Sequence, residues 1–282
     1  MSAASADGPS PSDQSPPGAP ERSGAAPREW DGASYDRISA PMERLGRDTL
    51  ERLPLTGRET VLDAGCGSGR VTEALLERVP QGHVIAIDAS ASMVREARRR
   101  LGERADVRQV DLLDLHLREP VDAILSTATF HWITDHARLY RRLHAALTPA
   151  GRLVAQCGGR GNVRLVHRAA EEAAAAKSWA RALREWRGPW NFTTAEQAAG
   201  WLGEAGFGQV RCWLQESAVT PPEPHEYLST IVLGAHLQRL APDRRDAFVE
   251  EVMARLGSPL VIDYVRLNID AVAEVRRLTR GS

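Results

Sequence analysis

The chain has 282 residues, of which 43% are hydrophobic, and its formal net charge at pH 7 is -1. This length suits one α/β domain with insertions, and the hydrophobic share supports a sizeable core. A nearly neutral chain lacks the basic face that neutralises phosphates, so nucleic acid is not expected as the main partner. No apolar run is long enough to span a membrane, so no membrane association is expected either.

The first 28 residues consist largely of Ser, Pro, Ala and Gly. They cannot bury enough apolar surface to offset their ordering entropy, so a disordered tail over 1–28 and a folded domain over 29–282 are expected. The tail contains no apolar region typical of a secretory signal. The three cysteines, Cys66, Cys157 and Cys212, are far apart and odd in number. They indicate neither a disulfide framework nor a metal site, which favours a reducing, cytoplasmic location.

The folded part opens with an aromatic-led segment that contains Trp30 and Tyr35. A helix is predicted to follow and to end near residue 53, because Pro54 and Gly57 come next. One interpretation of the two aromatic residues is that they anchor this helix through hydrophobic contacts.

Residues 61–70 read Val-Leu-Asp-Ala-Gly-Cys-Gly-Ser-Gly-Arg. An apolar strand that ends in a carboxylate, a glycine-rich turn and an amphipathic helix predict the ligand-binding corner of a doubly wound sheet. The glycines Gly65, Gly67 and Gly69 follow the pattern G-x-G-x-G, whereas a dinucleotide-binding turn follows G-x-G-x-x-G. Asp63 lies two residues before the first glycine, where its carboxylate would repel a pyrophosphate and attract a cation such as an ammonium group.

A second buried strand, over residues 83–87, is followed by Asp88. The spacing from the glycine turn is that of an acid that accepts both hydroxyls of a ribose. The alternative role of a helix cap is disfavoured, because Ser90 and Ser92 are better placed to cap the next helix. Met93 enters that helix, where it lies either in the core or close to a bound adenine.

Three further strands continue the predicted sheet, and polar residues follow two of them. Asp111 and Leu112 come after the third strand, and a stretch that contains Ser126 and His131 comes after the fourth. A helix capped by Asp135 then leads to the fifth strand. The three strands are predicted over residues 107–110, 121–125 and 152–156.

This order of features resembles the class I S-adenosylmethionine-dependent methyltransferases, and the motif Asp-Ala-Gly-Cys-Gly-Ser-Gly is similar to their first signature. The resemblance covers about residues 30–158 and implies a Rossmann-like α/β fold, a doubly wound, seven-stranded, mostly parallel sheet with a cofactor-binding core over about 55–158. It implies S-adenosylmethionine as the cofactor, which carries an ammonium and a sulfonium group and no phosphate. It also gives Tyr35 a second interpretation, in a segment that folds over the cofactor. The implied cofactor-binding residues are Asp63, Ala64, Gly65, Cys66, Gly67, Gly69, Asp88, Ala89, Met93, Asp111, Leu112, Ser126 and Tyr35.

Beyond residue 158 the sequence predicts further helices and two strands. Family members commonly end their sheet with an antiparallel hairpin, so the resemblance implies that helices near the C-terminus are inserted between its two strands. Substrate-covering helices are expected over about 160–206 and 225–257. The predicted elements are helices over 162–187, within 192–205, over 225–240 and over 242–256, and strands over 207–214 and 259–269.

Methyl transfer from a sulfonium is an in-line displacement, so the protein mainly aligns two reactants, which can supply roughly 7 to 11 kcal/mol of the barrier. A carboxylate acceptor needs no general base, whereas an oxygen or nitrogen that starts protonated does. His131 follows the fourth strand at the carboxyl edge of the sheet and is the candidate catalytic base. Its alternative role is that of a hydrogen-bonded wall residue. Trp132 either packs over the reactive methyl group or closes the core.

Within the family, the chain resembles the trans-aconitate methyltransferase type, which esterifies a carboxylate on a small polyacid. The resemblance rests on the N-terminal segment, the residue before Trp132 and the C-terminal helices, and His131 stands where a Gln is usual. The predicted function is therefore methyl transfer to a small-molecule acceptor, with a carboxylate as one candidate group. Four arginines could bind such an acceptor, although surface solvation explains each equally well: Arg160, Arg164, Arg187 and Arg266.

Three alternatives stay open. The first is an O- or C-methyltransferase of a natural product, whose apolar pocket some of the seven tryptophans would line. The second, a nicotinamide-dependent reductase, is disfavoured by Arg70, which stands where the last dinucleotide glycine would fall, and by the lack of a Tyr-x-x-x-Lys pair. The third is a protein that binds the cofactor without transferring its methyl group. The sequence does not distinguish a monomer from a homodimer.

Overall fold

The structure is a computed structural model that describes residues 40–183 and 186–274. The tail expected over residues 1–28 and the segment with Trp30 and Tyr35 lie outside these described residues. The first described element is the helix predicted to end near residue 53, which is α2 (Ala40–Glu51).

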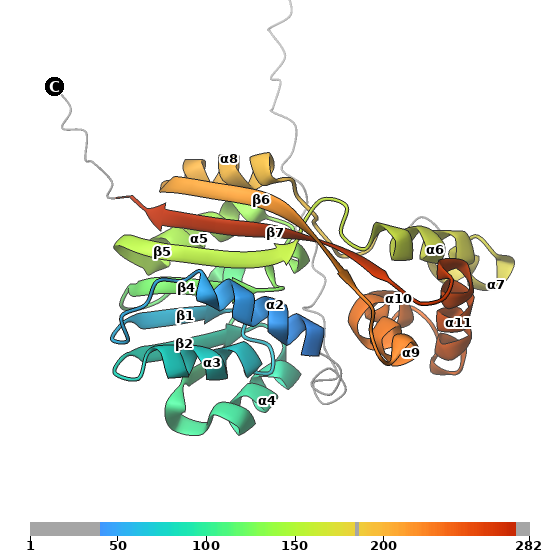
Figure 1. The fold of residues 1–282 in the computed structure, drawn as a ribbon, viewed down its shortest axis with the longest axis horizontal. Coiled ribbons are helices and arrows are strands. Elements are labelled where there is room, and N and C mark those ends of the chain that lie inside the picture. The colour runs from blue at the N-terminus through green and yellow to red at the C-terminus, as the bar shows by residue number, and fades with distance from the viewer. Residues whose placement is uncertain (1–39, 184–185, 275–282) are drawn as a thin grey trace, which may run out of the picture.

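Seven strands form one sheet of order β3-β2-β1-β4-β5-β7-β6. Strands β1 to β5 pair in parallel, whereas β7 runs antiparallel to both β5 and β6. The predicted doubly wound, mostly parallel sheet is therefore confirmed, and so is its antiparallel ending (Figure 1). The strands are β1 (Thr60–Ala64), β2 (His83–Asp88), β3 (Asp106–Gln109), β4 (Val121–Thr127), β5 (Leu147–Gly158), β6 (Phe207–Val219) and β7 (Ile262–Ala273).

Helices cover both faces of this sheet, which is why the central parallel strands β1, β2 and β4 are buried along most of their length. Neighbouring residues of β1 point to opposite faces: Val61 packs with Leu75 and Val94 in one core, and Leu62 packs with Leu139 in the other. The helices on the Val61 face are α2, α3 (Arg70–Arg78) and α4 (Ala91–Leu101), and those on the Leu62 face are α5 (His136–Ala146) and α8 (Ala195–Ala205).

A further hydrophobic core lies beside the sheet, among helices that join the ends of β6 and β7. Figure 1 shows these two long strands running on from the sheet into this helical part. Val166, Leu228 and Phe248 are fully buried there. The predicted helical insertion between the hairpin strands is confirmed. Its helices are α9 (Pro224–Tyr227), a π-helix (Leu228–Val232), α10 (Gly234–Leu237) and α11 (Arg245–Leu256), and they pack beside α6 (Arg164–Ala174) and α7 (Lys177–Leu183).

Two predicted helices are wrong in their continuity. The helix predicted over 162–187 is divided into α6 and α7, and it starts only at Arg164, because Gly161 and Val163 adopt φ angles of +87° and +47°. The break after α6 falls in a run of alanines, which favour helix, so the local sequence does not mark it. The helix predicted over 225–240 is likewise divided, by the π-helical turn.

We expect Arg52→Ala to lower the free energy of unfolding by about 1 to 3 kcal/mol. The Arg52 guanidinium donates to Asn268 Oδ1 (2.6 Å) and to the carbonyl of Ala155 (2.9 Å), and its loss leaves both acceptors without this donor. Chemical denaturation measures the change. The matched control is Arg47→Ala, on an exposed side chain of α2, the helix that ends just before Arg52, and a change within about 0.5 kcal/mol is expected for it. Equal effects would show that the Arg52 contacts do not stabilise the fold.

Candidate active site

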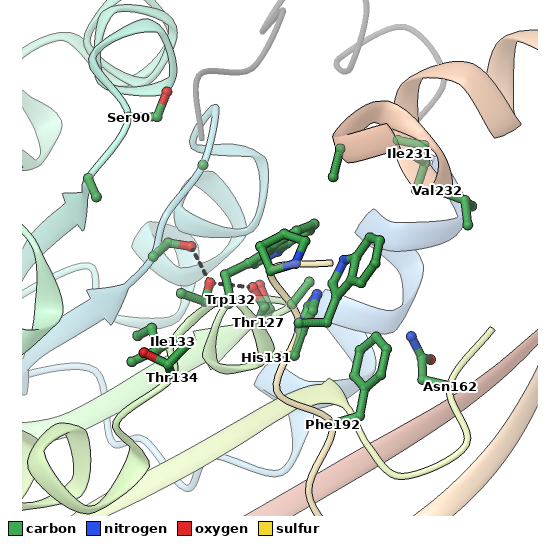
Figure 2. Close-up of a pocket in the computed structure, with 18 of the residues that line it drawn as sticks. Ser90, Thr127, His131, Trp132, Ile133, Thr134, Asn162, Phe192, Ile231 and Val232 are labelled. Carbon is green, nitrogen blue, oxygen red and sulfur yellow. Dashed lines mark hydrogen bonds between the residues drawn. The ribbon is translucent and has the colours of Figure 1, made fainter. Parts of the chain in front are cut away.

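A cavity of about 640 Å³ opens at the carboxyl ends of β1, β2 and β4. Ligands of open α/β sheets bind at this edge, at the point where the strand order reverses, which here lies between β1 and β4. One half of its wall comes from the ends of the parallel strands. The other half comes from the loops and helices of the C-terminal part, so that Ile231 and Val232 face His131 and Phe192 across it (Figure 2).

The glycine-rich turn contributes backbone to the strand half of the cavity. Gly65, Gly67 and Gly69 have φ angles of +88°, +54° and +85°, and the first two line the cavity. A Cβ on Gly65 would lie 2.1 Å from Thr129 Oγ1, whereas a Cβ on Gly67 would meet nothing within 4 Å. Gly69 instead lets α3 pack against Leu101 of α4. The open space beside Gly67 is therefore where a ligand could approach the turn.

Asp88 links the end of β2 to this turn. One of its carboxylate oxygens accepts the N–H of Gly67 (2.9 Å), and the other accepts the N–H of Ser90 (2.9 Å). Ser90 caps α4 by accepting from the N–H of Met93, as the sequence predicts. The half-buried Asp88 carboxylate also lines the cavity. Sequence reasoning missed its contact with Gly67, since nothing in the spacing shows that one acid can serve both the turn and a ligand.

Asp63 lies beneath the turn and not in the cavity wall. It is 1% exposed, and the hydroxyl of Thr72 donates to its Oδ2 (2.6 Å). Its Oδ1 is buried without a hydrogen-bond partner among the described residues. Burial, with a smaller contribution from the charge of Asp88, raises the pKa of Asp63 to about 7 against the lowering effect of the Thr72 hydrogen bond. Asp63 therefore does not form part of the cavity wall, and a ligand in the cavity would not contact it directly.

The other residues predicted to bind the cofactor divide into two groups, those that line the cavity and those that do not. Asp111 is exposed and accepts the N–H of Leu113 (2.9 Å), and Met93 is 3% exposed. Ser126 is buried and donates to the carbonyl of Ala64 (2.6 Å). Burial raises the pKa of the Cys66 thiol well above its ordinary value. Ala89, Met93, Asp111 and Leu112 line the cavity, whereas Ala64, Cys66, Gly69 and Ser126 do not, and Tyr35 is outside the described residues.

His131 lies in a short 3-10 turn (Phe130–Trp132) after β4 and lines the cavity. It is 7% exposed, and its Nδ1 accepts the N–H of Gly158 at 3.2 Å. A neutral imidazole with an unprotonated Nδ1 carries its proton on Nε2. In this tautomer Nε2 donates a hydrogen bond and has no lone pair with which to take a proton. The geometry thus favours the wall-residue interpretation of His131 over the general base.

Aromatic side chains form one part of the cavity wall. Trp190 and Phe192 are almost parallel, with an angle of 12° and ring centres 6.3 Å apart, and Trp132 lies 6.2 Å from Trp190. His167 packs against Trp190 at 4.4 Å, and burial lowers the pKa of His167 to about 4, so it is neutral at pH 7. Sequence reasoning foresaw that some tryptophans could line a pocket but did not identify Trp190, Phe192 or His167.

Of the four candidate arginines, Arg266 lines the cavity. It is 2% exposed, its Nε donates to Gln156 Oε1 (3.0 Å), and its guanidinium lies 5.7 Å from the centre of the Tyr264 ring. Arg160, Arg164 and Arg187 are exposed and lie outside the cavity. Arg266 of β7 and Gln156 of β5 thus meet only in the folded chain.

The described part of the chain contains no cluster of three His, Cys, Asp or Glu residues that could hold a metal ion. Within the same residues, no helix is both long and apolar enough to cross a membrane.

Comparisons with known proteins identify the strand half of the site. Residues 61–151 match a family described as a methyltransferase domain. The trans-aconitate 2-methyltransferase of Azoarcus sp. (strain BH72) is 40% identical over 127 residues, which are 45% of this chain and 50% of that protein. The enzyme of the same name from Yersinia pseudotuberculosis is 32% identical over 56% of this chain and 60% of its own length. The chain therefore spans about half the length of these curated relatives.

Solved structures share the fold at low sequence identity. A phosphoethanolamine N-methyltransferase 2 from Haemonchus contortus, in complex with S-adenosylhomocysteine, is 17% identical with a TM-score of 0.58, over 86% of this chain and 57% of that one. The [4+2]-cyclase SpnF is 20% identical with a TM-score of 0.55, over 83% of this chain and 82% of that one. Because a methyltransferase and a cyclase share this fold, the fold alone does not identify the reaction, which has to be argued from the residues of the site.

We expect Asp63→Asn to change how stability depends on pH. In the folded protein the pKa of Asp63 is about 7, against an ordinary value of 3.8. Between these values the folded state retains a proton that the unfolded state has lost, so this group makes the free energy of unfolding fall as pH rises. Asn cannot titrate. The stability of the wild type relative to the variant should therefore decrease from pH 4 to pH 7 and then level off, as thermal unfolding across this range would show. A difference that is constant with pH would contradict the raised pKa.

Proposed function

We propose that this protein, whose residues 61–151 form a methyltransferase domain on the class I fold, is an S-adenosylmethionine-dependent methyltransferase of a small-molecule acceptor. The observation that carries the proposal is the strand half of the cavity. There the open backbone of Gly67 lies beside the carboxylate of Asp88, and a second carboxylate, Asp111, lies farther along the same edge.

The electrostatics of this half fit S-adenosylmethionine better than a dinucleotide. Asp88 and Asp111 both line the cavity. Their carboxylates would repel a pyrophosphate, whereas they attract an ammonium or a sulfonium group. The nicotinamide-dependent reductase is therefore disfavoured on charge as well as on glycine spacing.

The side chains of the wall include acceptors that suit such a ligand. Asp88 lines the cavity with a carboxylate, a group that can accept the hydroxyls of a ribose. Asp111 uses one oxygen for the N–H of Leu113 and is exposed to the cavity. We propose that it accepts the amino group of the adenine, with Leu112 and Met93 packed against the ring.

When bound, S-adenosylmethionine supplies a methyl group already activated by the positive charge on its sulfur. Transfer to a carboxylate forms an oxygen–carbon bond and breaks the carbon–sulfur bond, whose electron pair remains on sulfur, and no proton moves. This reaction needs no general base. The tautomer of His131, with its proton on Nε2, suits it, because the imidazole can donate a hydrogen bond to the acceptor. The helices that close the cavity hold the acceptor in line with the methyl group.

The alternative acceptor is a natural product with an oxygen or carbon nucleophile. The aromatic wall of Trp132, Trp190 and Phe192 favours such an apolar molecule over a small polyacid. The relatives named trans-aconitate 2-methyltransferase favour the carboxylate. A protein that binds the cofactor without turnover would show affinity for S-adenosylhomocysteine and no methyl transfer to any acid or phenol. A cytoplasmic location belongs to the proposal, as Cys66 and Cys157 are free and buried.

We expect Asp88→Asn to weaken the binding of S-adenosylhomocysteine by about 10- to 100-fold, because hydrogen bonds to a charged group are worth about 1.5 to 3 kcal/mol each. Isothermal titration calorimetry measures the affinity. Asp114→Asn is the matched control, since that side chain is exposed and outside the cavity. Unchanged affinity in Asp88→Asn would remove the assignment of Asp88 to the ribose.

We expect Gly67→Val to abolish the binding of S-adenosylhomocysteine, because the valine side chain would occupy the open space beside the turn. The backbone at Gly67 also has a φ of +54°, which strains any residue that carries a Cβ. Gly102→Val separates the two effects: Gly102 has a φ of +57° and equally open surroundings, but it ends α4 away from the cavity. Both variants should lose similar stability in thermal unfolding, and only Gly67→Val should lose affinity. Normal affinity in Gly67→Val would contradict the proposed position of the ligand.

A further inference from the structure

The part of the cavity wall that faces the C-terminal helices presents hydrogen-bond donors. The carbonyl oxygen of the Asn162 side chain accepts the N–H of Val265 (3.0 Å), which leaves its amide nitrogen as the group that can face a ligand. Among the described residues, that nitrogen has no hydrogen-bond acceptor, although Asn162 is only 5% exposed. Figure 2 shows Asn162 beside Phe192 at the edge of the cavity.

Two more donors reach the same region. Arg266 pairs across the sheet with Gly158, and the N–H of Gly158 donates to His131. The Arg266 guanidinium is a buried positive charge in the cavity wall, and His131 carries its proton on Nε2. A charge in this position is stabilised by an anion that brings its own hydrogen-bond acceptors.

Carboxylates are confined to the opposite end of the cavity. Those among the described lining residues are Asp88 and Asp111, both at the ends of the parallel strands. His167, which packs against Trp190 and Phe192, is neutral at pH 7, because burial lowers its pKa to about 4. The part of the cavity around Asn162, Arg266 and the aromatic rings, called the acceptor half below, therefore favours an anion over an amine.

The body of the ligand would lie against flat, apolar surfaces. The nearly parallel rings of Trp190 and Phe192 form one wall, and Trp132 adjoins it. Ile231 and Val232 form the facing wall on the helical side (Figure 2). Gly158 allows this arrangement, because a Cβ there would lie 2.7 Å from the ring of Phe192 and 2.9 Å from the amide nitrogen of Asn162.

We infer that the acceptor is a carboxylic acid with a flat, unsaturated or aromatic body, whose carboxylate binds toward Asn162 and Arg266 and whose body lies among Trp132, Trp190 and Phe192. This inference rests on the proposed function, since it assigns the other half of the cavity to the cofactor. It differs from the small polyacid of the relatives' name. A polyacid would place further carboxylates against the aromatic walls, where the other arginine of the described lining, Arg239, is exposed and donates to the carbonyl of Ala182.

The inference is tested by calorimetry on the full chain saturated with S-adenosylhomocysteine. The probes are trans-cinnamate, its neutral amide, its amine analogue cinnamylamine, and trans-aconitate. Cinnamate should bind at least about tenfold more tightly than each of the others, since the amide lacks the charge and the amine reverses it. Equal binding of the amide, or tighter binding of the amine or of trans-aconitate, would overturn the inference. Absence of S-adenosylhomocysteine binding would instead overturn the proposed function.

The variant Asn162→Asp tests the role of the Asn162 amide nitrogen as a hydrogen-bond donor. It retains an oxygen to accept the N–H of Val265, and it replaces the donor nitrogen by a negatively charged oxygen. Cinnamate should bind at least about tenfold more weakly and cinnamylamine more tightly, with the affinity for S-adenosylhomocysteine unchanged. Gln81→Glu adds the same charge at an exposed position outside the cavity and should change none of these affinities. If Asn162→Asp binds cinnamate as the wild type does, the inference is wrong.

Discussion

The site depends on the way in which the end of β2 holds the glycine-rich turn. The carbonyl of Ile87 accepts the N–H groups of Gly65 and Cys66 (2.8 and 2.9 Å), and the next residue, Asp88, accepts that of Gly67. Three consecutive amides are thereby fixed in a backbone conformation that only glycine adopts readily at two of them. Because these bonds form within the chain, the turn has its shape before a ligand arrives, and binding does not have to order it.

Charge divides the cavity into two halves. Carboxylates line the end formed by β2 and β3, while the buried guanidinium of Arg266 and the amide of Asn162 lie on the opposite side. A cationic cofactor and an anionic acceptor would each be attracted to one half and repelled by the other. The protein would thus orient two reactants of opposite charge toward each other with fixed groups, which is where most of the rate advantage of methyl transfer can arise.

The periodicity of the sequence predicted the sheet and its helices because each element buries its own apolar face. It also predicted the acids at the ends of β2 and β3, since position along a strand fixes the edge at which a side chain lies. It could not predict the acceptor half. Asn162, Phe192 and Arg266 are brought together by antiparallel pairing of β5 with β7 and by the missing side chain of Gly158. Nor could it show that the N–H of Gly158 fixes the tautomer of His131, or that Asp63 lies beneath the turn with its pKa raised.

The family match covers one side of this division and only part of the other. The matched residues 61–151 contain the glycine turn, Asp88 and Asp111, together with His131 and Trp132, whereas Asn162, Trp190 and Arg266 all follow them. The conformation of the turn is set within the matched segment, so it does not depend on which helices are inserted between β6 and β7. Under the proposed function, changes in that insertion could therefore alter the acceptor without altering the cofactor site. For this reason the names of the relatives carry more information about the strand half of the cavity than about the molecule that would receive the methyl group.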